Sequence, residues 1–192
     1  MLPNPEALRA VVGFLAQYDI PYMVIGGLAN AVWGEVRATR DADFKISIGN
    51  RSLNEFRELV LQRFSERETS VPPHLRSGHV IHIWAMPGVA VDLLVSIFDY
   101  ERQAIERAIP MTMEGVPVRV CTAEDLVIHK VVANREQDWI DVERVLIRQK
   151  SKLDQGTIVN WIKHFAEALD TPEMLARYQQ LRVSYDPQGK GD

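Results

Sequence analysis

The sequence has little of several features that would each point to a particular class of protein. It contains a single cysteine, Cys121, among 192 residues, so no internal disulfide can form, and no cluster of cysteine and histidine has the spacing of a zinc site. No apolar run approaches the roughly 18 residues that are needed to span a membrane. The first residues lack the basic start, apolar run and small-residue cleavage site of a signal peptide. We therefore expect a cytoplasmic protein.

The sequence also lacks an excess of positive charge. Its formal net charge is −4, so the chain as a whole is not expected to coat nucleic acid, although a local basic patch is compatible with that sum. The hydrophobic fraction of 46% and the charged fraction of 25% are typical of a globular protein with a core. We expect one domain over residues 1–150, a helical extension over 151–185 and a disordered tail over 186–192.

Periodicity and turn residues predict an α+β fold, with a small mixed β-sheet in the first two-thirds of the chain and helices after it. Helices are expected after the capping residues Asn4, Ser52 and Thr122. A buried strand is expected over 22–25, a strand with one polar face over 41–48, and a hairpin around Pro87-Gly88. The other expected elements are a helix over 28–33, a loop over 69–78, a helix over 99–108, two short strands flanking Glu114-Gly115, and helices over 138–149, around 158–169 and after Thr171-Pro172.

Three aspartates are the candidates for a metal site. Asp41 and Asp43 are two residues apart on an expected strand and therefore share a face, with their backbones about 7 Å apart. Asp92 interrupts an apolar run on the expected hairpin, where a charged group is costly unless it is paired or bound to metal. Mg²⁺ takes one or two carboxylates together with substrate phosphates. The alternatives are a solvated strand face for the pair and an ion pair between Asp92 and an arginine.

Gly26 and Gly27 lie between the buried strand and the next expected helix. Glycine allows a ligand to approach the backbone closely, and the N–H groups at the start of a helix favour anions. The pair is therefore a candidate cradle for a triphosphate, and the alternative is a plain tight turn. His79 and His82, three residues apart on an expected strand, lie on opposite faces and do not form a metal pair.

Lys130 is the cation that we expect on the phosphates. It lies on an apolar expected helix, where the alternative is a lysine that extends its ammonium group to water. Asp138 follows eight residues later, near the same face if the helix continues, and is expected to orient Lys130 or to contact the nucleotide. For Asp138 and Asp141 the alternative is a charge effect at a helix N-terminus or an ion pair with Arg135.

Two runs of the sequence carry a resemblance to a known family. The run Val24-Ile25-Gly26-Gly27, followed by Arg40-Asp41-Ala42-Asp43, resembles the signature of the polymerase-β-like nucleotidyltransferase superfamily. The later run from Thr122 through Lys130, Arg135 and Asp138 to Asp141 resembles the helical motifs of its AbiEii/MenT-like toxin branch. The resemblance covers about residues 20–150.

The resemblance implies a nucleotidyltransferase that uses Mg²⁺ or Mn²⁺ to move a nucleotide from a nucleoside triphosphate to an acceptor hydroxyl. It implies a tRNA acceptor, and an antitoxin protein as a partner. The implied metal ligands are Asp41, Asp43 and Asp92, the nucleotide ligands are Gly26, Gly27, Arg40 and Lys130, and Asp138 completes the catalytic set. An acceptor that is a small hydroxyl compound such as an aminoglycoside, a protein acceptor, and a nucleotide-binding module without turnover stay open as alternatives.

Overall fold

The computed structural model of the chain describes residues 4–36, 39, 41–68 and 78–185. The expected tail over 186–192 and most of the expected loop over 69–78 lie outside the described residues. Among the described residues, no helix has both the length and the apolar character needed to cross a membrane. The chain divides into two compact units, one of residues 1–28 and 37–121 and the other of residues 29–36 and 122–192. The expected division at residue 150 stays a prediction.

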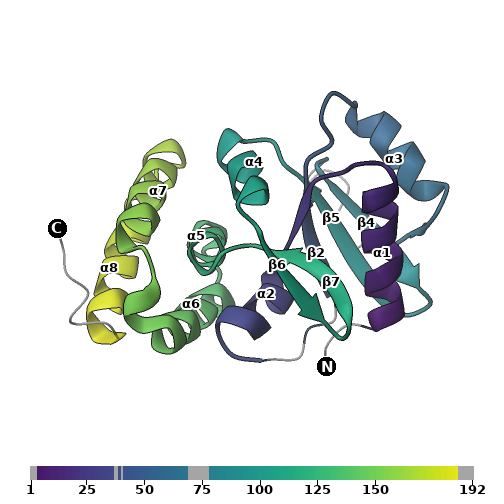
Figure 1. Ribbon diagram of the computed structural model, residues 1–192. Helices are drawn as coiled ribbons and strands as arrows, with labels where there is room; N and C mark the ends of the chain where they lie inside the picture. The colour runs from purple at the N-terminus through teal and green to yellow at the C-terminus, as the bar shows by residue number, and fades with distance from the viewer. Residues whose placement is uncertain (1–3, 37–38, 40, 69–77, 186–192) are drawn as a thin grey trace. The chain divides into compact units, whose positions relative to one another are not determined.

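A mixed β-sheet of seven strands forms the centre of the first unit, among the residues that the structure describes (Figure 1). Its order is β3-β4-β5-β2-β1-β7-β6, with the pairs β1/β7 and β2/β5 parallel and the others antiparallel. The strands are β1 (Tyr22–Ile25), β2 (Asp41–Ile46), β3 (Ser65–Glu66), β4 (Val80–Met86), β5 (Val89–Val95), β6 (Ile109–Met113) and β7 (Val116–Val120). The expected mixed sheet and both expected hairpins are confirmed.

Helices cover both faces of this sheet. The helix α1 (Pro5–Gln17) begins at Asn4, whose side chain accepts a hydrogen bond from the Glu6 amide, and it packs across β4 and β7. The helix α3 (Leu53–Leu61) has the expected capping box. The helix α4 (Asp99–Glu106) lies on the opposite side of the strands from α1 (Figure 1). Apolar residues that alternate along β2, β4 and β5 fill the space under α1 and α3, which leaves polar residues on the other face.

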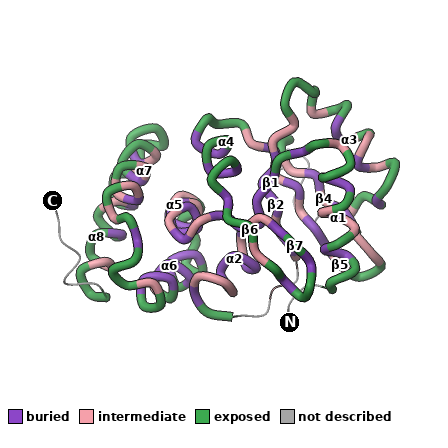
Figure 2. The backbone as a smooth tube through the Cα atoms, in the orientation of Figure 1, coloured by how far each residue is buried: buried purple, intermediate pink, exposed green. Residues whose placement is uncertain are grey.

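The second unit is helical. It contains α5 (Ala123–Ala133), α6 (Glu136–Gln149), a short 3-10 turn η2 (Lys150–Lys152), α7 (Gln155–Ala168) and α8 (Glu173–Tyr185), together with residues 29–33 of α2 (Gly26–Trp33). Figure 2 shows that α5 is buried along much of its length, whereas α7 and α8 expose one side each. The apolar residues of α5 contact α6 and α7, so α5 is the core helix of this unit.

Two local features bear on candidate site residues. Lys130 and Asp138 do not share one continuous helix, in agreement with the separate helix expected over 138–149: Asn134 adopts a left-handed conformation (φ 53°) that ends α5, and α6 begins at Glu136. The two-residue edge strand β3 was not expected, since two residues are too few to show an alternating pattern. Both features affect the surroundings of candidate site residues.

Candidate active site

The three candidate carboxylates lie on one face of the sheet in the first unit. Strands β2 and β5 run parallel in a register that places Asp43 beside Asp92 and Asp41 beside Ala90. Residues that are directly opposite each other on neighbouring strands share a face, so Asp43 and Asp92 lie side by side, with Asp41 two residues away. The sheet therefore brings together three carboxylates that are separated by up to 51 positions in the sequence (92 − 41).

An arginine and a histidine accompany these carboxylates. Arg67 follows β3, and its guanidinium group donates a hydrogen bond of 2.5 Å to Asp92 Oδ1 and lies 3.6 Å from Asp41 Oδ2. His82 on β4 is opposite Asp92, and its Nδ1 lies 2.9 Å from the same Oδ1. The ion pair between Asp92 and an arginine, one of the expected alternatives, is thus present. Its positive charge offsets the repulsion between the carboxylates.

Sequence reasoning missed both residues. Arg67 is 25 positions before Asp92, and its short strand carries no recognisable pattern. His82 was detectable: it alternates with the buried residues Ile81 and Ile83, so it had to lie on the polar face of the hairpin that carries Asp92. Among the described residues, no three histidine, cysteine, aspartate or glutamate side chains converge as they would around a metal ion. The guanidinium group of Arg67 lies between the oxygens of Asp41 and Asp92 instead.

The glycine turn lies directly against this face. Gly26 has a positive φ of 62°, and a Cβ atom built on it would lie 2.1 Å from Asp43 Oδ2. A Cβ on Gly27 would lie 2.8 Å from Thr39 Oγ1, which itself donates a hydrogen bond to the Asp41 carbonyl. Only glycine leaves room for the Asp43 carboxylate beside the backbone, so the turn and the aspartate strand form one structural feature.

Replacing Gly26 by alanine is expected to disable this site more than it destabilises the fold. The left-handed backbone costs about 1–2 kcal/mol for a residue with a Cβ atom. The new methyl group would also displace the Asp43 carboxylate. Gly49→Ala is the matched control, because Gly49 has the same φ of 62° and nothing within 4 Å of its Cβ position.

Urea unfolding and the nucleotidyl transfer that the family resemblance implies should be measured on both variants. We expect similar losses of stability in the two variants and a loss of transfer in Gly26→Ala alone. Equal transfer rates in the two variants would show that Gly26 serves the turn only.

Lys45 continues the polar face of β2 beyond Asp43. Its ammonium group donates a hydrogen bond of 2.5 Å to Glu101 Oε1 on α4, and both side chains are nine-tenths buried. Glu101 also accepts hydrogen bonds from the amides of Ile97 and Phe98. Burial would raise the pKa of Glu101, but the charge of Lys45 and these hydrogen bonds outweigh it and lower the pKa below its ordinary value. This ion pair fixes α4 over the end of the carboxylate face.

Lys130 and Asp138 lie in the second unit, in a buried charge network. The Lys130 ammonium group donates hydrogen bonds of 2.8 Å to Asp138 and 2.7 Å to Asp141, and the lysine side chain is 7% exposed. Arg135 contacts the second oxygen of Asp138, and the Asn30 amide nitrogen lies 3.4 Å from Asp141. Burial would raise the pKa of Asp138, but the hydrogen bonds and charges of Arg135 and Lys130 outweigh it and lower that pKa.

The network decides between the alternatives for these residues. A lysine that extends its ammonium group to water is wrong for Lys130, because two carboxylates hold it inside the unit. Asp138 does orient Lys130, as expected, although the two residues lie on different helices. The ion pair of Asp138 with Arg135 is present as well. The role of Lys130 as a phosphate ligand stays a prediction, and Arg40 lies outside the described residues.

Known proteins of similar structure have nucleotidyltransferase folds. The chain superposes on a nucleotidyltransferase-like protein from Paracoccidioides brasiliensis with a TM-score of 0.50 and 16% identity, over 93% of this chain and 94% of that one. It is also similar to the lincosamide adenylyltransferase LnuA in its lincomycin-bound form, with a TM-score of 0.48 and 11% identity over 74% and 96% of the two chains. A third similar structure is that of ANT(2″)-Ia in complex with adenylyl-2″-tobramycin, with a TM-score of 0.48 and 14% identity over 95% and 99%.

The fold is thus similar to that of nucleotidyltransferase-like proteins. The profile of the family described as "Nucleotidyl transferase of unknown function" (DUF2204) matches residues 4–180, and the chain belongs to this family. No curated protein matches the sequence. That the chain belongs to a nucleotidyltransferase family is therefore confirmed, while the AbiEii/MenT-like branch, the tRNA acceptor and the antitoxin partner stay predictions.

Proposed function

We propose that the protein is a Mg²⁺-dependent enzyme that transfers a nucleoside monophosphate from a nucleoside triphosphate to an acceptor hydroxyl group, with release of pyrophosphate. The observation that carries this proposal is the register of β2 and β5, which places Asp43 beside Asp92 on the face that the glycine turn approaches. A solvated strand face would not require a glycine whose missing Cβ makes room for a carboxylate oxygen. The family description supports the same reaction class.

The three carboxylates are of the ligand type that a hard divalent cation takes, and the proposal requires them to converge when it binds. Asp41, Asp43 and Asp92 offer carboxylate oxygens on one face, which is the ligand type that Mg²⁺ and Mn²⁺ take together with phosphate oxygens. The space that a Gly26 Cβ would fill is the space around Asp43 Oδ2. The Arg67 guanidinium group pairs with Asp92 and Asp41, so a cation held by all three carboxylates would have to displace it. Bound there, Mg²⁺ would supply positive charge that stabilises the phosphate oxygens during transfer.

The chain's own residues have separate tasks in the proposed reaction. The amides at Gly26 and Gly27, at the beginning of α2, bind the triphosphate. Asp92 takes the proton of the acceptor hydroxyl group. The oxygen of that hydroxyl group forms a bond to the α-phosphorus, and the bond between the α-phosphorus and pyrophosphate breaks. His82 orients Asp92 through the contact of 2.9 Å between Nδ1 and Oδ1. Arg40, next to Asp41 in the sequence, is a proposed phosphate ligand.

Binding of nucleotide and metal together tests the proposal. A ligand that binds only the native state raises the melting temperature, and it adds about 2.7 kcal/mol of stability at a hundredfold excess over its dissociation constant. We expect at least one of ATP, GTP, CTP and UTP to raise the melting temperature with Mg²⁺ and to lose that effect in EDTA.

The control is the same titration with the nucleoside, which lacks the phosphates. A melting temperature that no triphosphate changes at millimolar concentration in the presence of Mg²⁺ or Mn²⁺ would show that the proposed function is wrong.

A further inference from the structure

An exposed tryptophan lies on the same face as the carboxylates. Along β4, Ile81 and Ile83 are buried on the core face, which places His82 and Trp84 on the polar face. Trp84 is opposite Ala90, and Ala90 is opposite Asp41. The three residues therefore form one row across β4, β5 and β2. Trp84 is 39% exposed although its side chain is largely apolar.

Ala90 and Arg67 connect Trp84 to the carboxylates. The residue between Trp84 and Asp41 is alanine, whose methyl group extends least from the sheet, and the strand spacing sets the two ends of the row about 10 Å apart. The Arg67 guanidinium carbon lies 5.9 Å from the centroid of the Trp84 ring, so the same arginine contacts the indole and the carboxylates. A cavity of about 340 Å³ lies beside Trp84 at the turn between β4 and β5, where Arg63, Met86 and Gly88 also line it, and the three aspartates are not part of its lining.

The geometry of the transfer reaction indicates from which side of the sheet the acceptor approaches. In an in-line displacement the attacking oxygen and the leaving pyrophosphate are on opposite sides of the α-phosphorus. Across the strands the order is the glycine turn after β1, Asp43 on β2, Asp92 on β5 and then β4. If the glycine turn binds the triphosphate, the acceptor hydroxyl approaches from the side of β4. That is the side on which Trp84 is exposed.

We infer that Trp84 is the platform of the acceptor site and that the acceptor is a small hydroxylated molecule with a ring that stacks on the indole. This inference rests on the proposed function, since it names the acceptor of the same reaction. A ring of that kind would lie over the row from Trp84 to Asp41, with its hydroxyl group at Asp92. A single exposed aromatic side chain offers a stacking surface for one compact ring.

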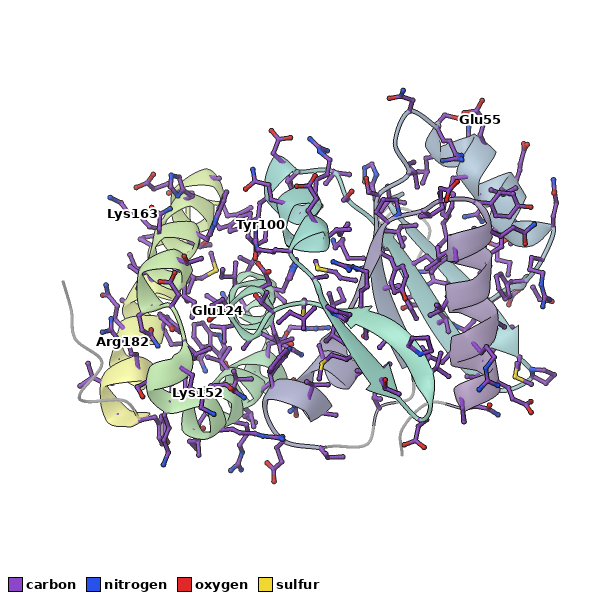
Figure 3. All side chains as sticks on the ribbon, in the orientation of Figure 1. Glu55, Tyr100, Glu124, Lys152, Lys163 and Arg182 are labelled. Carbon is purple, nitrogen blue, oxygen red and sulfur yellow. The ribbon has the colours of Figure 1, made fainter. Side chains whose placement is uncertain are left out.

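The charges favour a small acceptor over RNA. RNA binding needs lysine or arginine side chains that neutralise several phosphates, but Arg67, which lies on this face in the described part of the chain, is paired with Asp92 and Asp41. In the second unit, Lys152, Lys163 and Arg182 are spread along the unit (Figure 3), and the basic residues that are close in sequence, Arg144, Arg148, Lys150 and Lys152, belong to α6 and η2, not to the sheet. The net charge of −4 acts in the same direction.

Labelled transfer separates the possible acceptors. The protein, Mg²⁺ and triphosphates labelled at the α-phosphate should be incubated with the dialysable small-molecule fraction of a cell extract and, in parallel, with total RNA from that extract. We expect label in a dialysable compound. In Trp84→Ala we expect the half-saturating amount of the fraction to rise roughly tenfold, with an unchanged thermal shift by triphosphate and Mg²⁺. Trp84→Phe should retain most of the affinity, because it keeps an aromatic face.

Phe98→Ala is the matched control, because it removes another exposed aromatic side chain, 55% exposed, from the same unit. It should leave transfer unchanged. Label in RNA alone, or a wild-type half-saturating amount in Trp84→Ala, would overturn the acceptor site proposed here. Failure of the proposed function gives a different pattern, in which the wild-type protein shows neither a thermal shift with triphosphate and Mg²⁺ nor transfer of label to either fraction.

Discussion

Replacing Asp43 by asparagine is expected to abolish nucleotidyl transfer while the fold remains intact. Asparagine keeps the shape of the side chain beside Gly26 but removes the negative charge that the proposed metal site needs. The loss of such an electrostatic contribution costs on the order of a hundredfold to a thousandfold in rate. The free energy of unfolding should stay constant or rise slightly, since one of three neighbouring carboxylates, Asp43 beside Asp92 and near Asp41, becomes neutral.

Transfer rate and melting temperature should be measured on the same preparation, because only their combination separates a catalytic from a structural loss. Asp99→Asn is the matched control: Asp99 is in the same unit, its side chain is 83% exposed, and it pairs with Arg102 on the helix surface. This control should change stability by less than about 0.5 kcal/mol and leave transfer unaffected. A wild-type transfer rate in Asp43→Asn would remove Asp43 from the proposed metal site.

The part of the site that sequence reasoning predicted is local. The strand 22–25, the glycine turn and the alternation from Asp41 onward each depend on neighbours within a few residues, so period and turn chemistry were sufficient. Asp92 was found because a charge within an apolar strand is costly wherever the strand lies. The expected strand over 41–48 ended at Ile46, a difference of the size usual for element ends.

The rest of the site depends on pairings that no local pattern encodes. Arg67 reaches Asp92 only because β3 adds to the edge of the sheet beside β4, and Lys45 is buried only because α4 supplies Glu101. The alternation along β2 indicates a polar face, but it does not show that Lys45 on that face is buried. The contact between Lys130 and Asp138 was expected if one helix continued through both residues, yet it forms across the break at Asn134. Tertiary packing decided each of these cases.

Replacing Lys130 by alanine is expected to destabilise the helical unit by about 3–5 kcal/mol, because it leaves carboxylates buried without their cation. Asp138 keeps Arg135, whereas Asp141, whose side chain is 2% exposed, loses a hydrogen bond of 2.7 Å to a positive charge. The double variant Lys130→Met with Asp141→Asn should recover part of the loss, since it removes the charge as well as its partner. Urea unfolding of Lys130→Met, of Asp141→Asn and of the double variant measures the coupling between the two residues.

The same variants test the sequence-based role of Lys130 as a phosphate ligand, provided that rates are expressed per folded molecule. Lys163→Ala, on the exposed side of α7, is the control and should change neither stability nor rate. A phosphate ligand would cost on the order of a hundredfold in transfer beyond the loss of folded protein, and Lys130→Arg would restore it only in part, because a planar guanidinium group replaces a compact ammonium group. A wild-type rate in the folded fraction of Lys130→Ala would restrict Lys130 to holding α5 and α6 together through Asp138 and Asp141. An unchanged free energy of unfolding in Lys130→Ala would contradict even that structural role.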